Sequence, residues 1–301
     1  MSIFVHFHAY MLTERRLAHN TYLAYKRDLA QFELFLQKNS IALEVIRAKH
    51  VKHFLRTLRA VEDLTARSLA RKVATLKLFF SYAHERFNIQ NCGEHLITPK
   101  IKKALPQYLS EQEVEAFLAA AEADNSPLGI RNKVIVYLLY ISGMRISELT
   151  ALYVSSIHFD TGFLKVHGKG DKERMIPVPL EMMSILREYL QTVHREFIDR
   201  KGGCSGEEYL FPTSYSGKIK PITRQACWVI LNTIWEKTAI KKRISPHQLR
   251  HSLATHMLKN GVDLRSLQLI LGHENIMTVE VYTHVEVSHL RESYDKSHPR
   301  S

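Results

Sequence analysis

The chain has 301 residues, of which 45% are hydrophobic, so it can build one large core or two smaller ones, and a disordered or fibrous protein is excluded. Its 42 Lys and Arg residues outnumber its 30 Asp and Glu residues, and the net charge of +12 favours a polyanionic partner such as nucleic acid. No apolar run approaches the ~20 residues of a membrane span, and Glu14, Arg15 and Arg16 interrupt the N-terminal apolar stretch before any signal-peptide cleavage site, so we expect a cytoplasmic protein with no membrane partner.

In residues 4–87 apolar side chains recur at steps of three and four, which predicts a helical N-terminal domain. Asn20 and Thr21 are expected to cap a helix that carries Lys26 and Arg27 on its polar side. A second basic helix face is predicted from four residues: Arg67, Arg71, Lys72 and Lys77. Such faces are usually only solvated, but two of them in one small domain also suit binding to DNA phosphates.

Residues 98–106 are basic and bounded by prolines, so this segment should be extended. We place the domain boundary there, with a helical domain over 1–97, a linker over 98–106 and a second domain over 107–301. Three linker lysines can follow the backbone of a duplex: Lys100, Lys102 and Lys103. The alternative is an ordinary solvated hinge.

The second domain should open with a capping box over residues 110–113. A following apolar helix should stop at Gly143, because glycine is the usual left-handed residue at a helix end, and Arg145 then starts a new element. Residues 163–167 and 173–178 are predicted to form a β-hairpin.

The turn of this hairpin contains Lys169, which is either simply exposed or able to protonate a leaving oxygen. From Pro179 onward we expect only helices. The fold class is therefore mainly α, with a small β-hairpin in the second domain.

Residues 245–248 form a helix start with a Ser cap and Pro at the first helical position. His247 and Arg250 should share one face of this helix, and its N-terminal end suits a phosphate. The helix should end at Gly261. Zinc binding by His247 with the histidines at 251 and 256 is not expected, because the spacing matches no zinc motif.

Asp263 should cap the next helix and Gly272 should end it, which directs His273 away from the helix end. Tyr282 follows nine residues later. Taken alone, His273 suits a surface turn and Tyr282 suits a packed aromatic residue. Arg145 taken alone suits a surface ion pair with Glu148 worth ~0.3 kcal/mol.

Together these residue types suit attack by a tyrosine on a phosphodiester. Guanidinium groups bind phosphate oxygens, imidazoles move protons or donate hydrogen bonds, and a phenol can become a covalent ester.

Cys92, Cys204 and Cys227 are too far apart for a disulfide framework or a metal knuckle and are expected to fill the core. We therefore expect no metal and no cofactor.

Four segments resemble the signature boxes of the tyrosine recombinases, within them the Xer group: residues 143–149, 247–251, 271–273 and 282–284. The resemblance covers nearly the whole chain and implies a two-domain clamp around double-stranded DNA. It implies that Arg145 and Arg250 bind the scissile phosphate, that Lys169 protonates the leaving 5′ oxygen and that Tyr282 forms a 3′-phosphotyrosine.

The resemblance also implies that His247 accepts the tyrosine proton, His273 hydrogen-bonds a phosphate oxygen and Glu148 supports the site. Implied partners are a homo- or hetero-tetramer with a second Xer-type recombinase and a septal DNA translocase as activator. The implied function is resolution of chromosome dimers at a dif-type site. The chain departs from the family pattern at residues 279–280, where Val-Glu replaces the common Thr-Gln.

No additional DNA-binding domain precedes Phe4, which favours a Xer-type enzyme over the larger phage integrases. Residues 288–294 resemble a tail that docks on a neighbouring protomer, and a frayed terminal helix is the alternative. Three other functions stay open: a mobile-element integrase, a type IB topoisomerase and a non-catalytic DNA-binding regulator.

Overall fold

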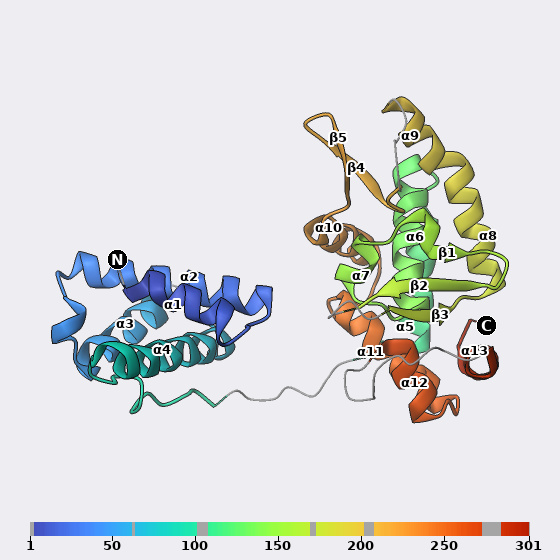
Figure 1. Ribbon diagram of the computed structural model, residues 1–301. Helices are drawn as coiled ribbons and strands as arrows, with labels where there is room; N and C mark the ends of the chain where they lie inside the picture. Colours follow the sequence, from blue (N-terminus) through green and yellow to red (C-terminus); the bar gives the residue numbers. More distant parts are fainter. Residues whose placement is uncertain are drawn as a thin grey trace. The chain divides into compact units, whose positions relative to one another are not determined.

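The computed structural model describes residues 3–61, 64–100, 108–168, 173–201, 208–272 and 284–300. The chain divides into two compact units, Met1–Leu105 and Pro106–Ser301. In Figure 1 the first unit is blue to teal and the second runs from green to red. Each unit has a hydrophobic core of its own.

The described part of the first unit is helical. Its elements are α1 (Ile3–Thr13), α2 (His19–Lys38), the short 3-10 turn η1 (Leu43–Val45), α3 (Ala48–Val61) and α4 (Ala66–Phe87). Helices α1, α2 and α4 pack on one another around aromatic rings, among which Phe32 of α2 contacts Phe54 of α3 and Phe80 of α4. The predicted helical character of residues 4–87 is confirmed.

The predicted cap of helix α2 was wrong. The helix begins at His19, so Asn20 and Thr21 lie in its first turn. Ala18 occupies the cap position without a side-chain acceptor, and its carbonyl oxygen accepts from the main-chain N–H groups of Thr21 and Tyr22 at 2.8 and 3.0 Å. The main chain therefore begins this helix without the side-chain oxygen that the sequence suggested.

The second unit is built from helices with two small antiparallel sheets. Its elements are α5 (Glu111–Glu122), α6 (Pro127–Ile141), α7 (Ile146–Thr150), η2 (Val154–Ser156), β1 (Ile157–His158), β2 (Phe163–His167), β3 (Glu173–Pro177), α8 (Leu180–Tyr189), the π-helical turn η3 (Leu190–His194), α9 (Arg195–Arg200), β4 (Pro212–Tyr215), β5 (Lys218–Pro221), α10 (Arg224–Trp235), α11 (Pro246–Lys259), α12 (Leu264–Leu271) and α13 (His284–Ser297).

Helix α6 is the centre of this unit, as Figure 1 shows. Residues 134–141 are at most 2% exposed, and α5, α7, α8, α10 and α11 all contact the helix. A helix that is apolar on every side must be covered on every side. The central position of α6 fixes the place at which the chain leaves its C-terminal end, next to Gly143.

The predicted β-hairpin is confirmed. Strands β2 and β3 pair antiparallel, with Leu164 opposite Ile176 and Val166 opposite Arg174. Strand β1 adds a third strand beside β2, which the sequence did not indicate because two residues are too few to show an alternation. The sheet places the start of β3 beside α12, which contacts it.

The expectation of only helices beyond Pro179 was wrong, because β4 and β5 form a second hairpin. Ser216 and Gly217 make its two-residue turn with φ of 50° and 74°, the left-handed values that a tight hairpin requires. Prolines at both strand ends hid the alternating pattern, since proline ordinarily argues against a strand.

Helix α13 packs on its own unit. Leu290 and Tyr294 are at most 1% exposed, and the Tyr294 hydroxyl donates to the Ile141 carbonyl at 3.0 Å. The Arg291 guanidinium donates to the carbonyls of Gly162 and Val178 at 3.2 and 3.0 Å. The alternative of a frayed terminal helix was therefore wrong, while docking on a neighbouring protomer stays a prediction.

Candidate active site

The first part of the site is the turn between α6 and α7. Gly143 has a φ of 57°, and a Cβ atom there would lie 2.8 Å from side-chain carbons of Leu253 and Leu271, so both conformation and space call for glycine. Arg145 follows as the residue that caps α7. The predicted helix stop and the new element at Arg145 are both confirmed.

Glu148 holds Arg145 in place twice. The Arg145 main-chain N–H donates to Glu148 Oε2 at 2.7 Å, and Nη1 donates to Oε1 at 2.9 Å. The Arg145 side chain is 34% exposed, whereas that of Glu148 is only 4% exposed. The pair is therefore more than the surface ion pair considered from the sequence, because its carboxylate is buried.

The second part of the site is helix α11. Ser245 accepts from the Gln248 main-chain N–H at 3.1 Å, and Pro246 occupies the first helical position, as predicted. Arg250 extends from this helix and donates to the Gly143 carbonyl at 2.7 Å and to the Leu271 carbonyl at 2.6 Å. Arg250 thus connects the end of α6 to the end of α12.

Arg174 on β3 is a part of the site to which the sequence analysis gave no role. It is 6% exposed and donates two hydrogen bonds to the Glu148 carboxylate, from Nη1 to Oε1 at 3.1 Å and from Nη2 to Oε2 at 2.8 Å. Its Nε donates to the Ile270 carbonyl at 3.1 Å. An arginine two residues before Ile176 and four before Val178, on the face of the strand that these apolar residues share, was the one sequence signal that could have indicated it.

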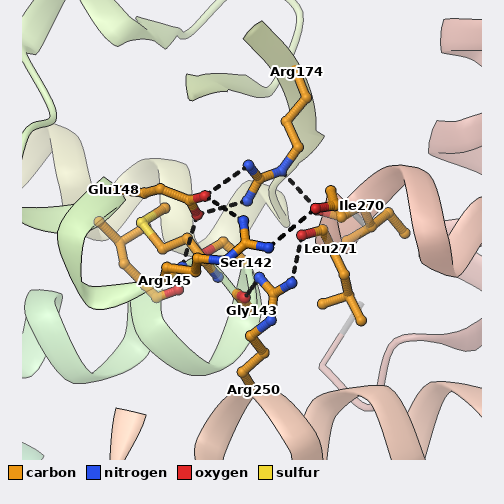
Figure 2. Close-up of polar contacts among 11 residues, drawn as sticks. Ser142, Gly143, Arg145, Glu148, Arg174, Arg250, Ile270 and Leu271 are labelled. Atoms are coloured by element: carbon orange, nitrogen blue, oxygen red, sulfur yellow. Dashed lines mark hydrogen bonds and ion pairs between the residues drawn. The ribbon is translucent and has the colours of Figure 1, made fainter. Parts of the chain in front are cut away.

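The C-terminal end of α12 is where these arginines meet, as Figure 2 shows for the Ile270 and Leu271 contacts. Three successive carbonyls each accept from a different arginine. The pairs are Ile270 with Arg174, Leu271 with Arg250, and Gly272 with Arg145 Nη2 at 3.2 Å. Carbonyls in the last turn of a helix have no main-chain N–H donor within that helix, so arginines from three separate elements donate to them instead.

Positive charge is concentrated here. Burial, followed by the charges of Arg145 and Arg174, lowers the pKa of the Arg250 guanidinium to about 10. Burial alone would raise the pKa of the Glu148 carboxyl, but the hydrogen bonds and charge of Arg174, with those of Arg145, hold that pKa below its usual value. The Arg250 guanidinium and the Glu148 carboxylate are therefore both charged at neutral pH.

His247 is exposed in the first turn of α11, three residues before Arg250, so the two lie on one face of the helix as predicted. His256 on the same helix is buried and bonds the Tyr140 hydroxyl and the Leu109 carbonyl, both at 2.9 Å. This histidine is a packing residue. In the described part of the chain no three His, Cys, Asp or Glu residues are grouped to hold a metal ion.

Lys169, His273 and Tyr282 lie outside the described residues, and so do Lys102 and Lys103. The structure describes what borders them. Strand β2 precedes Lys169 and strand β3 follows it, while helix α12 precedes His273. The Asp263 side chain caps the start of α12, where its Oδ1 accepts from the Ser266 main-chain N–H at 2.8 Å, and Gly272 ends the helix at a φ of 67°.

The predicted DNA-binding residues of the first unit fall into two groups. Lys26, Arg27 and Arg67 are exposed, as is Lys100 after α4. Lys72 differs, because it is 4% exposed and its ammonium binds Asp28 at 3.0 Å and Gln31.

Arg71 binds the same Asp28 carboxylate and also the Ala24 carbonyl at 3.2 Å, with 38% of its side chain exposed. The basic face predicted on α4 is therefore partly an internal ion-pair cluster that joins α4 to α2.

Cys92 and Cys227 are buried free thiols, as expected, and Cys204 lies outside the described residues. Among the described helices, none is long and apolar enough to cross a bilayer.

Residues 107–289 match the phage integrase family, and residues 4–86 match the phage integrase N-terminal SAM-like domain. The first match covers more than half of the chain, so the chain belongs to the phage integrase family, whose members are tyrosine recombinases. The resemblance inferred from the signature segments is confirmed.

Two curated relatives specify the type. Tyrosine recombinase XerD of Listeria monocytogenes serotype 4b (strain F2365) is 36% identical over 301 residues, 99% of this chain and 98% of the relative. Tyrosine recombinase XerD of Staphylococcus aureus (strain N315) is 36% identical over 290 residues, 96% of this chain and 95% of the relative. The chain is a tyrosine recombinase of the XerD type, an enzyme of site-specific DNA recombination.

Two solved structures share the fold. XerH site-specific recombinase bound to difH substrate has a TM-score of 0.66 at 22% identity, covering 91% of this chain and 76% of that chain. A lambda integrase dimer bound to a COC' core site has a TM-score of 0.67 at 18% identity, covering 97% and 76%. The mainly α fold with small β-sheets is the fold of these recombinases.

Proposed function

We propose that this enzyme cuts and rejoins duplex DNA through a 3′-phosphotyrosine at Tyr282. The observation that carries the proposal is the charge of the site. The Glu148 carboxylate pairs with Arg145 and Arg174, and the Arg250 guanidinium interacts electrostatically with all three of these groups. Three positive charges minus one leave two, which suits a phosphodiester whose equatorial oxygens gain negative charge in the transition state.

The proposed roles follow from this charge and from the family. Arg145 and Arg250 bind the non-bridging oxygens, and Tyr282 attacks the phosphorus atom. Lys169 protonates the leaving 5′ oxygen and His247 accepts the phenol proton. The ester keeps the energy of the broken bond, so rejoining needs no nucleotide cofactor.

The remaining residues have supporting roles in the proposal. His273 donates a hydrogen bond to a phosphate oxygen, and Glu148 orients Arg145. We assign DNA backbone contacts to the first unit and the linker, which would form the two-domain clamp with the second unit. The basic residues assigned to these contacts are Lys26, Arg27, Arg67, Arg71, Lys100, Lys102 and Lys103. Lys72 is omitted because its ammonium is buried and bound to the Asp28 carboxylate.

A nicked suicide substrate tests the chemistry. The native enzyme should form a covalent complex that survives denaturant, with the adduct mapping to Tyr282. Tyr282→Phe should form none. The control is Tyr215→Phe in the β4–β5 hairpin, whose tyrosine is 70% exposed, and it should behave as the native enzyme. An adduct on another residue, or cutting by Tyr282→Phe, would contradict the proposal.

We further propose that the reaction resolves chromosome dimers at a dif-type site in the cytoplasm, within a tetramer that contains a second Xer-type recombinase and is activated by a septal DNA translocase. The support is the 36% identity to XerD over 99% of the chain. Of the two solved structures named above, one is XerH bound to difH substrate and the other is a lambda integrase dimer bound to a COC' core site.

A supercoiled plasmid with two directly repeated dif-type sites from the host chromosome tests this role. With the partner recombinase added, the enzyme should delete the intervening segment, and each recombinase alone should not. Recombination at the ends of a mobile element, with none at the dif-type site, would instead indicate an integrase. Relaxation of a plasmid that lacks such sites would indicate a topoisomerase.

A further inference from the structure

We propose that Arg174 is a positioning residue for strand cleavage, which neutralises Glu148 and holds the end of α12 so that Arg145 and Arg250 face the scissile phosphate. This inference rests on the proposed function, because it concerns how the phosphate-binding arginines are oriented. Arg174 itself is 6% exposed with Nε, Nη1 and Nη2 all engaged within the protein, so it is poorly placed to bind DNA directly.

The first step of the argument concerns Glu148. Each of its oxygens accepts two hydrogen bonds, one from Arg145 and one from Arg174. Without Arg174, the buried carboxylate would have Arg145 as its one cationic partner within contact distance among the described residues. The two would form a closed pair, and Arg145 would offer less of its charge to a phosphate.

The second step concerns α12. Arg174 binds the Ile270 carbonyl, next to the carbonyls that Arg250 and Arg145 bind. A Cβ atom on Gly272 would lie 3.0 to 3.1 Å from the Arg174 side chain, so this side chain packs directly under the end of the helix. Loss of Arg174 would free the last turn of α12, from which the chain continues to His273.

The third step concerns β3. Arg174 is the second residue of this strand, which begins directly after residues 169–172, and it lies opposite Val166 of β2. One side chain therefore joins the strand that follows Lys169, the helix α7 that carries Glu148 and the helix α12 that precedes His273. A planar guanidinium can donate to the Ile270 carbonyl and to both oxygens of Glu148 at once, whereas an ammonium cannot.

The test separates cleavage from binding. Arg174→Met, Arg174→Lys and the control Arg131→Met are compared by unfolding in urea, by DNA affinity in a Tyr282→Phe background and by the single-turnover rate on the suicide substrate at saturating enzyme. Arg131 is a partly buried arginine of α6 that bonds Asn132 and touches none of the site residues named above.

The expected result is a slower reaction with nearly unchanged binding. Arg174→Met should cleave about 100-fold more slowly, the loss typical of a misplaced catalytic group, and Arg174→Lys about tenfold more slowly. DNA affinity should change less than about threefold for both, and Arg131→Met should cleave at the native rate. Arg174→Lys decides the question if Arg174→Met does not fold.

A double variant tests the route through Glu148. If Arg174 acts through this carboxylate, Glu148→Gln combined with Arg174→Lys should cleave no more slowly than the slower single variant, because coupled residues are not additive. Losses that multiply would overturn the route through Glu148. The whole inference would fall if both Arg174 variants cleaved at the native rate at saturation, or if Arg131→Met slowed cleavage equally.

The two proposals fail in different ways. If the native enzyme forms no Tyr282 adduct, the proposed function fails and the inference fails with it. If the native enzyme forms the adduct and the Arg174 variants form it equally fast, the proposed function stands and only the positioning role of Arg174 is refuted.

Discussion

Lys72 and Asp28 form an ion pair in the interior of the first unit, with 3.0 Å between Nζ and Oδ1 and side chains 5% and 3% exposed. Arg71 and Thr75 bind the same carboxylate. The pair joins α2 to α4, so it acts on the stability of the unit that we propose to carry DNA-contacting residues.

Asp28→Ala should therefore destabilise the protein by about 3–5 kcal/mol, because it leaves a buried ammonium without its carboxylate. Urea unfolding measures this loss. Glu14→Ala is the matched control, since its pair with Arg86 is more than half exposed on both sides and should contribute less than about 1 kcal/mol. Equal losses for the two variants would contradict the internal role of Asp28.

Lys26→Ala and Arg27→Ala should weaken DNA binding without changing stability. Both side chains are exposed on α2, and each lost phosphate contact should reduce the salt slope of log K by about 0.9. Titration at several salt concentrations measures the slope. Lys38→Ala, which removes an exposed lysine at the C-terminal end of the same helix, is the control, and a similar fall in its slope would show a diffuse charge effect.

Gly272→Ala should slow cleavage at least tenfold. Its φ of 67° is unfavourable for alanine, and the new methyl group would press on the Arg174 guanidinium. Gly261→Ala is a matched control, because its φ is 87° and nothing lies within 4 Å of a Cβ atom there. Both variants should lose about 1 kcal/mol of stability, and only the first should lose activity in the suicide-substrate assay.

His298→Phe should make stability less dependent on pH. Burial, followed by the charges of Arg300 and His256, lowers the pKa of His298 to about 3, whereas an unfolded chain has a His pKa near 6.5. The unfolded state therefore binds more protons between these values, so the contribution is complete above about pH 6.5 and is lost as the pH falls towards 3.

The measurement is urea unfolding at pH 7.5 and pH 5. Over the window from about 6.5 to 5, the native protein should lose about 2 kcal/mol more than the variant, at ~1.4 kcal/mol per pH unit. Phenylalanine keeps the ring that stacks on Tyr294 at 4.6 Å. Parallel pH profiles for the two proteins would contradict the assignment to His298.

The features predicted correctly from the sequence are mostly local. The capping box at Ser110, the cap at Ser245 and the left-handed stops at Gly143 and Gly272 each depend on a few neighbouring residues, and these signals are present in any short window. The apolar spacing likewise predicted most of the helices, because burial acts on one face of most of them.

The features that the sequence analysis missed depend on distant partners. Arg174 meets Ile270 across 96 residues and Glu148 across 26, so nothing beside Arg174 in the chain indicates its contacts. Lys72 looked like part of a solvated face because Asp28 lies 44 residues away. In both cases the charged side chain was visible and its burial was not, since burial follows from the packing of whole elements.

The three carbonyls at the end of α12 restrict how this helix can vary. Inserting one residue between the Asp263 cap and Gly272 would rotate the last turn by about 100° and advance it by about 1.5 Å. Each carbonyl would then point away from the arginine that now binds it. Natural variants should therefore keep the length of this helix fixed while their surface loops grow and shrink.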